Sequence, residues 1–345
     1  MTQLCETYER VELQLAKLWR DIFGRPVGVD DDFFEIGGDS VRAIDLMQRI
    51  ENCFGRRVSP SEFFATPSIK GLATNLMNGT GRSWSPLVPI QTNGRATPLF
   101  CVHPGGGDVW CYYDLSRALG TDQPCYGLMA KGCDGEAAPL ACVKSMARSY
   151  LAAIRQQQPR GPYALAGWSF GGLVAFELAC QLQREGEQVD LLAIIDAGIV
   201  YSFALLRVIL PGCKSAFIQY SSIDTDDMFP LFAAHGRAAN IIPHNASEGK
   251  IRRTFDVFCA NTLATSEFRP CWYAGKIVLF QGRQRLAHAR YDPYREWTQI
   301  ADEVEHVWVP GTHLSLLQPP HDSVLAGEIL QRLPGTSAAG RRHAA

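Results

Sequence analysis

The stretch YALAGWSFGGLVAFEL, residues 163–178, is the part of the sequence that is most informative about the fold. Its first four residues are apolar and predict a short strand, and from Leu173 onward the apolar residues continue as a helix. Between them lies Gly-x-Ser-x-Gly, with Ser169 at its centre. On a sharp strand-to-helix turn this pattern indicates a nucleophilic serine, because a Cβ two residues before or after it would collide with neighbouring backbone. The alternative is a glycine-rich turn that only packs a helix closely onto a strand.

Apolar runs that predict strands alternate with helical stretches on both sides of this segment. The further strands are expected at 99–103, 191–196, 277–281 and 304–309. Such alternation is typical of a mostly parallel sheet covered by helices. After Asp196 it gives way to a mostly helical insertion rich in Phe and Leu, at about residues 197–269, which we interpret as a lid over a site.

A nucleophilic serine requires a base and an acid, which an α/β-hydrolase supplies after it in chain order. Asp196 ends one predicted strand and His313 follows another, so both should lie at the sheet edge where Ser169 is expected. We therefore predict the catalytic residues Ser169, His313 and Asp196. Taken singly, Asp196 could cap a lid helix and His313 could be an ordinary surface or core residue.

The first predicted strand leads into His-Pro-Gly-Gly-Gly, residues 103–107. His103 competes as the base, but it precedes the nucleophile and adjoins the glycines. We assign this loop to oxyanion binding, with the backbone N–H groups of Gly105 and Phe170 as the predicted donors. A tight strand-to-helix turn is the alternative, and one loop can serve both purposes.

The first 77 residues carry a different pattern, with apolar residues at helical spacing that predict four helices. The sequence DDFFEIGGDS, residues 31–40, runs directly into the second of these helices. By position alone, Asp39 or Ser40 is a helix cap. Residues 78–98 are rich in Gly, Ser, Thr and Pro and indicate a linker.

The pattern D-x-F-F-x-x-G-G-D-S before a helix resembles the peptidyl carrier domains of nonribosomal peptide synthetases, over nearly all of residues 5–77. In that family the serine carries 4'-phosphopantetheine. The resemblance therefore implies a covalent arm on Ser40, with Gly38 and Asp39 forming the turn that presents it. A phosphodiester at a helix N-terminus is also electrostatically favourable.

The combination of His-Pro-Gly-Gly, Gly-Trp-Ser-Phe-Gly-Gly, an Asp before a helical lid and Gly-Thr-His resembles the type I thioesterase domains that terminate these synthetases, over about residues 96–333. In those domains the acid commonly follows the strand after the nucleophile helix, as Asp196 does. Many other α/β-hydrolases place it one strand later, which leaves Asp292 as the less favoured candidate. The resemblance implies a serine thioesterase.

We therefore expect an N-terminal all-α four-helix carrier bundle (1–77), a linker (78–98), an α/β-hydrolase thioesterase domain with a helical lid (99–333) and a disordered tail (334–345). The implied function is to carry a peptidyl or acyl thioester and release it through an acylated Ser169. Release by hydrolysis or by macrocyclisation would end the synthesis of a nonribosomal peptide or peptide–polyketide hybrid, a secondary metabolite such as an antibiotic.

The implied partners are a phosphopantetheinyl transferase, the adenylation and condensation domains of a synthetase, and the acyl thioester substrate. A start directly at a carrier helix suggests excision from a longer chain. The alternative function is a carrier and docking module whose hydrolase fold edits or acts as a scaffold. Reductive release would need a dinucleotide-binding fingerprint, and no convincing Gly-x-Gly-x-x-Gly after a strand is present.

Composition excludes several other classes of protein. With 33 Lys and Arg against 35 Asp and Glu, the net charge of -2 argues against a nucleic-acid partner. Eleven scattered Cys without a Cys-x-x-Cys pair favour reduced thiols and no metal site. The charged first turns and the interrupted apolar stretches predict neither a secretory signal nor a membrane span. We expect a cytoplasmic monomer.

Overall fold

The structure is a computed structural model that describes residues 2–78, 84–199, 225–238, 242, 246–284 and 292–334. Parts of four predicted segments lie outside these residues. They are positions 79–83 of the linker, 200–224, 239–241 and 243–245 of the lid, 285–291 of the thioesterase domain beyond the lid, and 335–345 of the tail. Phe217 and Tyr220, two aromatic residues of the predicted lid, are also outside the described residues.

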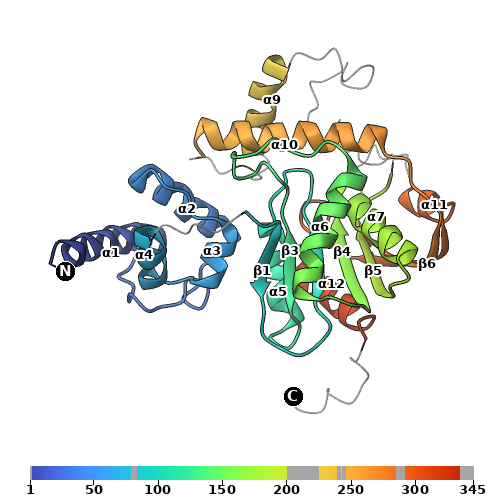
Figure 1. Cartoon of the computed structure of the whole chain (residues 1–345), viewed down its shortest axis with the longest axis horizontal. Coiled ribbons are helices and arrows are strands. Elements are labelled where there is room, and N and C mark those ends of the chain that lie inside the picture. Colours follow the sequence, from blue (N-terminus) through green and yellow to red (C-terminus); the bar gives the residue numbers. More distant parts are fainter. Residues whose placement is uncertain are drawn as a thin grey trace.

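The first 78 residues contain four helices, drawn in blue in Figure 1: α1 (Thr2–Phe23), α2 (Ser40–Phe54), α3 (Pro60–Ala65) and α4 (Ile69–Asn78). The Phe33 ring is fully buried at their centre and meets the rings of Trp19 and Phe63 edge-on, at centroid distances of 5.1 and 5.2 Å. Gly55, in the left-handed region at φ 64°, ends α2 as its C-cap. The predicted helical carrier bundle is confirmed.

The described residues from 84 onward form a seven-stranded sheet in the order β1-β3-β2-β4-β5-β6-β7, and among these strands only the β1–β3 pair is antiparallel. The strands are β1 (Leu87–Gln91), β2 (Leu99–Val102), β3 (Cys125–Leu128), β4 (Tyr163–Trp168), β5 (Val189–Ile195), β6 (Tyr273–Gly282) and β7 (Ala301–Val309). The predicted α/β-hydrolase fold is confirmed.

Helices cover both faces of this sheet, because strand residues alternate between the two faces. Side chains such as Phe100 and Leu165 pack with α6 (Val143–Gln157) and α7 (Phe170–Arg184). Their neighbours Cys101 and Ala166 face α5 (Tyr113–Leu119) and α12 (His321–Leu330). The short helices η1 (Trp110–Tyr112) and α11 (Pro293–Trp297) connect strands to these layers.

Two strands differ from the sequence-based expectation. β1 lies inside the segment 78–98, so the predicted linker is too long at its C-terminal end. This strand contains Pro89, which is tolerated because β1 is the edge strand of the sheet. β3 was missed because it has only four residues and includes Gly127, where a Cβ would lie 2.7 Å from the Val109 side chain.

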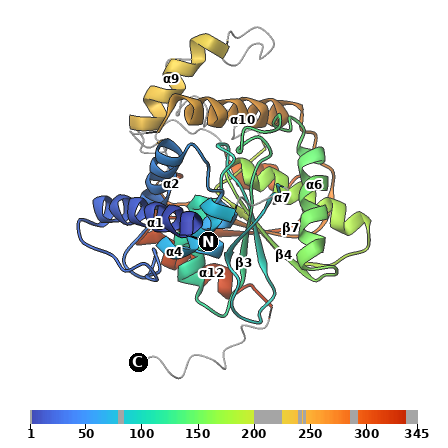
Figure 2. The same cartoon turned by 60° about the vertical axis from the view of Figure 1, so that its left-hand side comes forward.

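The described part of the predicted lid is helical, in α9 (Thr225–Ala238) and α10 (Glu248–Glu267). Figures 1 and 2 show α10 crossing above both the sheet and α2. The two lid helices share a small apolar core, which includes Phe232, Ile251 and Phe255.

The helical bundle packs directly on the hydrolase fold through aromatic side chains. The Phe34 ring stacks on the Tyr113 ring at 4.0 Å, and the Phe64 ring lies 4.7 Å from that of Trp110. Polar contacts join α2 to α10, where Ser247 donates to Gln48 and Arg253 lies 3.6 Å from Glu51. We call these aromatic and polar contacts together the carrier interface.

Candidate active site

Ser169 occupies the turn between β4 and α7, in a backbone conformation that an L-residue rarely adopts (φ 56°, ψ -126°). The flanking glycines permit this turn. A Cβ on Gly167 would lie 2.1 Å from the Gly171 carbonyl oxygen, and a Cβ on Gly171 would lie 2.3 Å from that of Val102. This strained, sharp turn therefore presents the Ser169 side chain at the carboxyl edge of the sheet.

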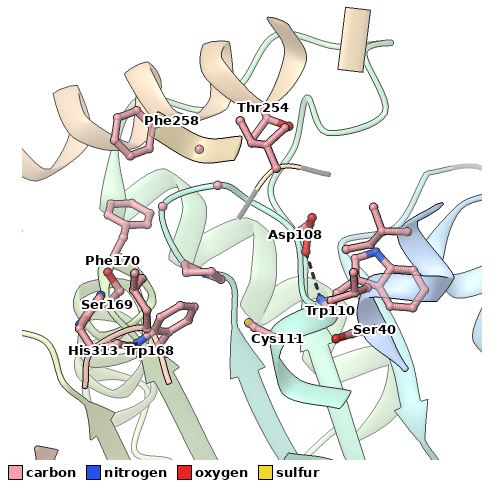
Figure 3. A pocket seen from close by; sticks show the side chains of 18 of the residues that line it. Ser40, Asp108, Trp110, Cys111, Trp168, Ser169, Phe170, Thr254, Phe258 and His313 are labelled. Carbon is pink, nitrogen blue, oxygen red and sulfur yellow. Dashed lines mark hydrogen bonds between the residues drawn. The ribbon is translucent and has the colours of Figure 1, made fainter. Parts of the chain in front are cut away.

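Asp196 and His313 meet at the same edge, although 117 residues separate them. The Asp196 Oδ2 and His313 Nδ1 atoms are 2.7 Å apart, and both side chains are buried. Asp196 also has a positive φ of 45° and accepts a weak hydrogen bond of 3.4 Å from the Gly282 N–H. Figure 3 shows His313 beside Ser169 on the wall of a cavity.

Trp168 supports this arrangement, and sequence reasoning did not identify its role. Its indole lies against the His313 ring at a centroid distance of 5.2 Å, and its Nε1–H donates to the His313 carbonyl at 3.1 Å. The Trp168 N–H is held by the Tyr112 hydroxyl at 2.8 Å. The position of this bulky side chain directly before Ser169 is the sequence feature that could have indicated its role.

The two competing candidates lie in other surroundings. His103 is fully buried and bonded to the Pro104 carbonyl at 2.8 Å and the Tyr150 hydroxyl at 2.7 Å. Burial lowers the pKa of His103 to about 4. Asp292 is the N-cap of α11, where it accepts from the Tyr294 N–H at 3.2 Å.

Both predicted oxyanion donors line the cavity. Phe170 is the first residue of α7, where helix N–H groups have no intrahelical acceptor. The Gly105 carbonyl accepts from the Nδ2 of Asn261 at 2.9 Å, which ties the glycine loop to α10. Sequence reasoning did not identify Asn261. The feature that marks it is an amide buried within a lid helix, which is visible in the structure.

Ser40 is the first residue of α2, and Asp39 is the cap, which accepts from the Arg42 N–H at 2.8 Å. A Cβ on Gly38 would lie 2.4 Å from the Phe33 carbonyl oxygen, so a glycine is required in the turn before Ser40. The Ser40 side chain is partly buried and lines the same cavity as Ser169.

This cavity has a volume of about 710 Å³ and lies between the bundle, the carboxyl edge of the sheet and the lid. Ser40 lies on one side of it, and Ser169 and His313 lie on the other (Figure 3). A long, narrow group attached to Ser40 would therefore fit inside the protein and reach toward Ser169. The residues present fit a covalent phosphopantetheine arm.

The fold and the site define a carrier bundle joined to a serine hydrolase. Residues 14–76 match the family described as phosphopantetheine attachment site, and residues 97–202 match the thioesterase domain family. The chain thus combines a carrier domain of the phosphopantetheine-attachment family with a serine thioesterase domain, a pair that is also found in nonribosomal peptide synthetases.

Several synthetases contain a similar region. The chain is 33% identical to a dimodular nonribosomal peptide synthase of Bacillus subtilis over 88% of its length, and 31% identical to malpibaldin synthetase of Mortierella alpina over 94%. It spans only 13% and 6% of these two proteins.

Solved structures agree with this assignment. A four-domain nonribosomal peptide synthetase, solved in holo form with AMP and glycine, matches 94% of the chain with a TM-score of 0.62 and 27% identity, and the match covers 26% of that synthetase. The Vlm2 thioesterase domain matches 72% of the chain over 98% of its own length with a TM-score of 0.60, and at 21% identity this likeness concerns the fold alone.

The described part of the chain also bears on membrane spans and metal sites. Within it, no helix is long and apolar enough to cross a membrane. The same residues contain no group of three or more His, Cys, Asp or Glu side chains arranged to hold a metal ion.

Proposed function

We propose that this chain holds a peptidyl or acyl thioester on a phosphopantetheine arm at Ser40 and releases it through an acyl-enzyme on Ser169. The single cavity lined by both serines carries this proposal. Bound at Ser40, the arm supplies the thioester linkage and the reach across the cavity. Because carrier and hydrolase belong to one chain, delivery depends on effective concentration and not on free diffusion.

The proposed base is His313, and Asp196 holds it in the required tautomer. Since the Asp196 carboxylate can only accept, the His313 Nδ1 carries the ring proton, and the unprotonated Nε2 takes the proton of Ser169. The Ser169 oxygen forms a bond to the acyl carbon and the carbon–sulfur bond breaks. His313 then returns the proton to the leaving thiol.

The proposed oxyanion donors are the N–H groups of Gly105 and Phe170. Both belong to backbone that is already fixed, one by the Asn261 side chain and one by the start of α7. Donors that need no rearrangement during the reaction stabilise the developing negative charge most effectively.

The second step releases the acyl group by water or by an amine or hydroxyl of the same chain. His313 activates either nucleophile. Among the lid aromatics, Phe232 and Phe258 line the cavity and give it an apolar wall, whereas Phe229 and Phe255 pack within the lid. The mass of the released product distinguishes the linear acid from the ring.

The carrier domain implies interaction with other synthetase domains and with a phosphopantetheinyl transferase. We propose that adenylation and condensation domains supply the acyl chain and that the active form is a monomer. The nine cysteines whose side chains the structure describes have free thiols, in keeping with the reducing cytoplasm that we propose for the reaction.

Intact-protein mass spectrometry tests the function. The full chain is incubated with coenzyme A or a peptidyl-pantetheine donor and a phosphopantetheinyl transferase, as wild type, Ser40→Ala and Ser169→Ala. We expect the arm on wild type and Ser169→Ala but not on Ser40→Ala, and a persistent acyl-carrier only in Ser169→Ala. If wild type and Ser169→Ala lose the acyl group from the arm equally, the result would favour the scaffold or editing function.

A further inference from the structure

The cavity has an uneven distribution of charge. Its described lining includes three carboxylates, those of Asp39, Asp108 and Asp114, and one Lys or Arg side chain, Lys250. Asp39 and Asp114 lie close enough for the charge of Asp39 to raise the Asp114 pKa, after the larger effect of burial. An anionic group attached at Ser40 would therefore meet like charges, with Lys250 as the available counter-charge on the cavity wall.

Lys250 lies in the first turn of α10, where its N–H donates to the cap Ser247 at 3.3 Å. Ser247 in turn contacts Gln48 of the carrier, so Lys250 lies where the lid helix meets the bundle. Its side chain is partly buried, and burial lowers its pKa, opposed by the charges of Asp108 and Glu51. The positive charge of Arg253 also lowers the pKa of Lys250.

Within the described residues, no carboxylate lies within ion-pairing distance of the Lys250 ammonium and no acceptor forms a hydrogen bond with it. An ammonium group removed from bulk water is costly unless acceptors surround it. A ligand that enters the cavity can supply such acceptors. A ligand that displaces the water must replace its hydrogen bonds, so the site favours a ligand rich in oxygen.

Asp108 supplies the complementary group. One of its carboxylate oxygens accepts from the Trp110 N–H at 3.1 Å, which leaves acceptor capacity on the other. In Figure 3 its carboxylate lies beside Trp110, on the Ser40 side of the cavity. The wall there thus offers a cationic donor and an anionic acceptor to whatever extends from Ser40.

A phosphopantetheine arm matches this pair of groups in its chemistry. It carries a phosphodiester anion next to the attachment point, then a hydroxyl and two amides. We propose that Lys250 and Asp108 form a binding site for the arm, in which the Lys250 ammonium pairs with phosphodiester or carbonyl oxygens and the Asp108 carboxylate accepts from the hydroxyl or an amide N–H. This inference rests on the proposed attachment at Ser40.

The site would hold the arm in a defined direction across the cavity before chemistry begins. Lys250 and Asp108 are then positioning residues, because they contact the arm and leave the acyl carbon to Ser169. A charge-assisted hydrogen bond is worth about 1.5–3 kcal/mol, so loss of Lys250 should shift the equilibrium from bound to mobile arm by at least about tenfold.

Spin-label mobility measures this equilibrium without any turnover. A phosphopantetheinyl transferase transfers a nitroxide-labelled phosphopantetheine from its coenzyme A conjugate to the full chain, and electron paramagnetic resonance reports the mobile fraction. The set comprises wild type, Lys250→Met, Lys250→Arg and, as a matched control, Lys144→Met, which removes an exposed lysine of α6 outside the cavity.

We expect a largely immobilised label in wild type and Lys144→Met, a mobile label in Lys250→Met, and recovery in Lys250→Arg. Thermal unfolding checks that each variant is folded. Equal label mobility in wild type and Lys250→Met overturns the binding site while the arm is verified on Ser40 by mass. A label absent from Ser40 overturns the proposed function as well, so the two failures are distinguishable.

Discussion

At the scale of single residues, the two histidines near Ser169 differ because of what their ring nitrogens face. His313 faces a carboxylate, which accepts a hydrogen bond from its Nδ1–H. His103 faces a carbonyl and a phenol. Its Nδ1–H donates to the Pro104 carbonyl and its Nε2 accepts from Tyr150, so the neutral ring satisfies both neighbours.

The pH dependence of stability should report His103. Its folded pKa of about 4 lies below the ordinary 6.5, so between these values the unfolded state binds more protons and falling pH favours unfolding. The full effect, reached below pH 4, is about 3 kcal/mol. We expect His103→Gln to lose less free energy of unfolding than wild type between pH 6.5 and 4.

Denaturant titrations of wild type and His103→Gln between pH 6.5 and 4 measure this difference in the free energy of unfolding. The matched control is His321→Gln, a partly exposed histidine at the start of α12, which should keep the wild-type slope. Parallel curves for His103→Gln and wild type would show that His103 is not the group that titrates.

At the scale of elements, the turn between β4 and α7 depends on close backbone approach. Gly171 brings α7 against the end of β2, where a Cβ would lie 2.3 Å from the Val102 carbonyl oxygen and 2.7 Å from that of His103. Backbone cannot yield as a flexible side chain can, so any larger residue must displace the helix that carries Phe170.

Gly171→Ala should therefore destabilise the protein by about 1–3 kcal/mol, the usual cost of overpacking. Gly327→Ala is the matched control, because its Cβ would meet nothing within 4 Å in the middle of α12. That substitution should be neutral or stabilising by up to about 1 kcal/mol, since alanine favours helix. Free energies of unfolding from urea titration compare the two, and equal values would refute the close-approach argument.

At the scale of the whole molecule, the carrier interface holds Ser40 at the cavity. Tyr113 contributes from the hydrolase side, where its buried ring stacks on Phe34. The two domains are joined covalently, so a modest contact energy is enough to keep them docked.

Tyr113→Ala should weaken docking without altering any carrier residue. An aromatic pair contributes about 0.5–1.5 kcal/mol beyond the area it buries, so the undocked population should rise roughly tenfold or more. Small-angle X-ray scattering would report a larger radius of gyration. Trp272→Ala removes an exposed indole beside β6 and should leave the scattering unchanged. Unchanged scattering in both variants would mean that the Tyr113 ring does not hold the domains together.

Features that depend on neighbours along the chain could be predicted from the sequence alone. The glycines around Ser169, the turn before Ser40 and the four amphipathic helices are local, because each is set by sterics or periodicity within a few residues. The order of Ser169, Asp196 and His313 was readable for the same reason, since each follows a recognisable strand or turn.

The contacts between residues far apart in the chain became visible in the three-dimensional fold. It paired β1 with β3 and brought Asn261 to the Gly105 carbonyl, 156 residues away. It also set Ser40, Lys250 and Ser169 around one cavity. These contacts depend on complementary surfaces of elements far apart in the chain, and no local spacing or periodicity records such complementarity.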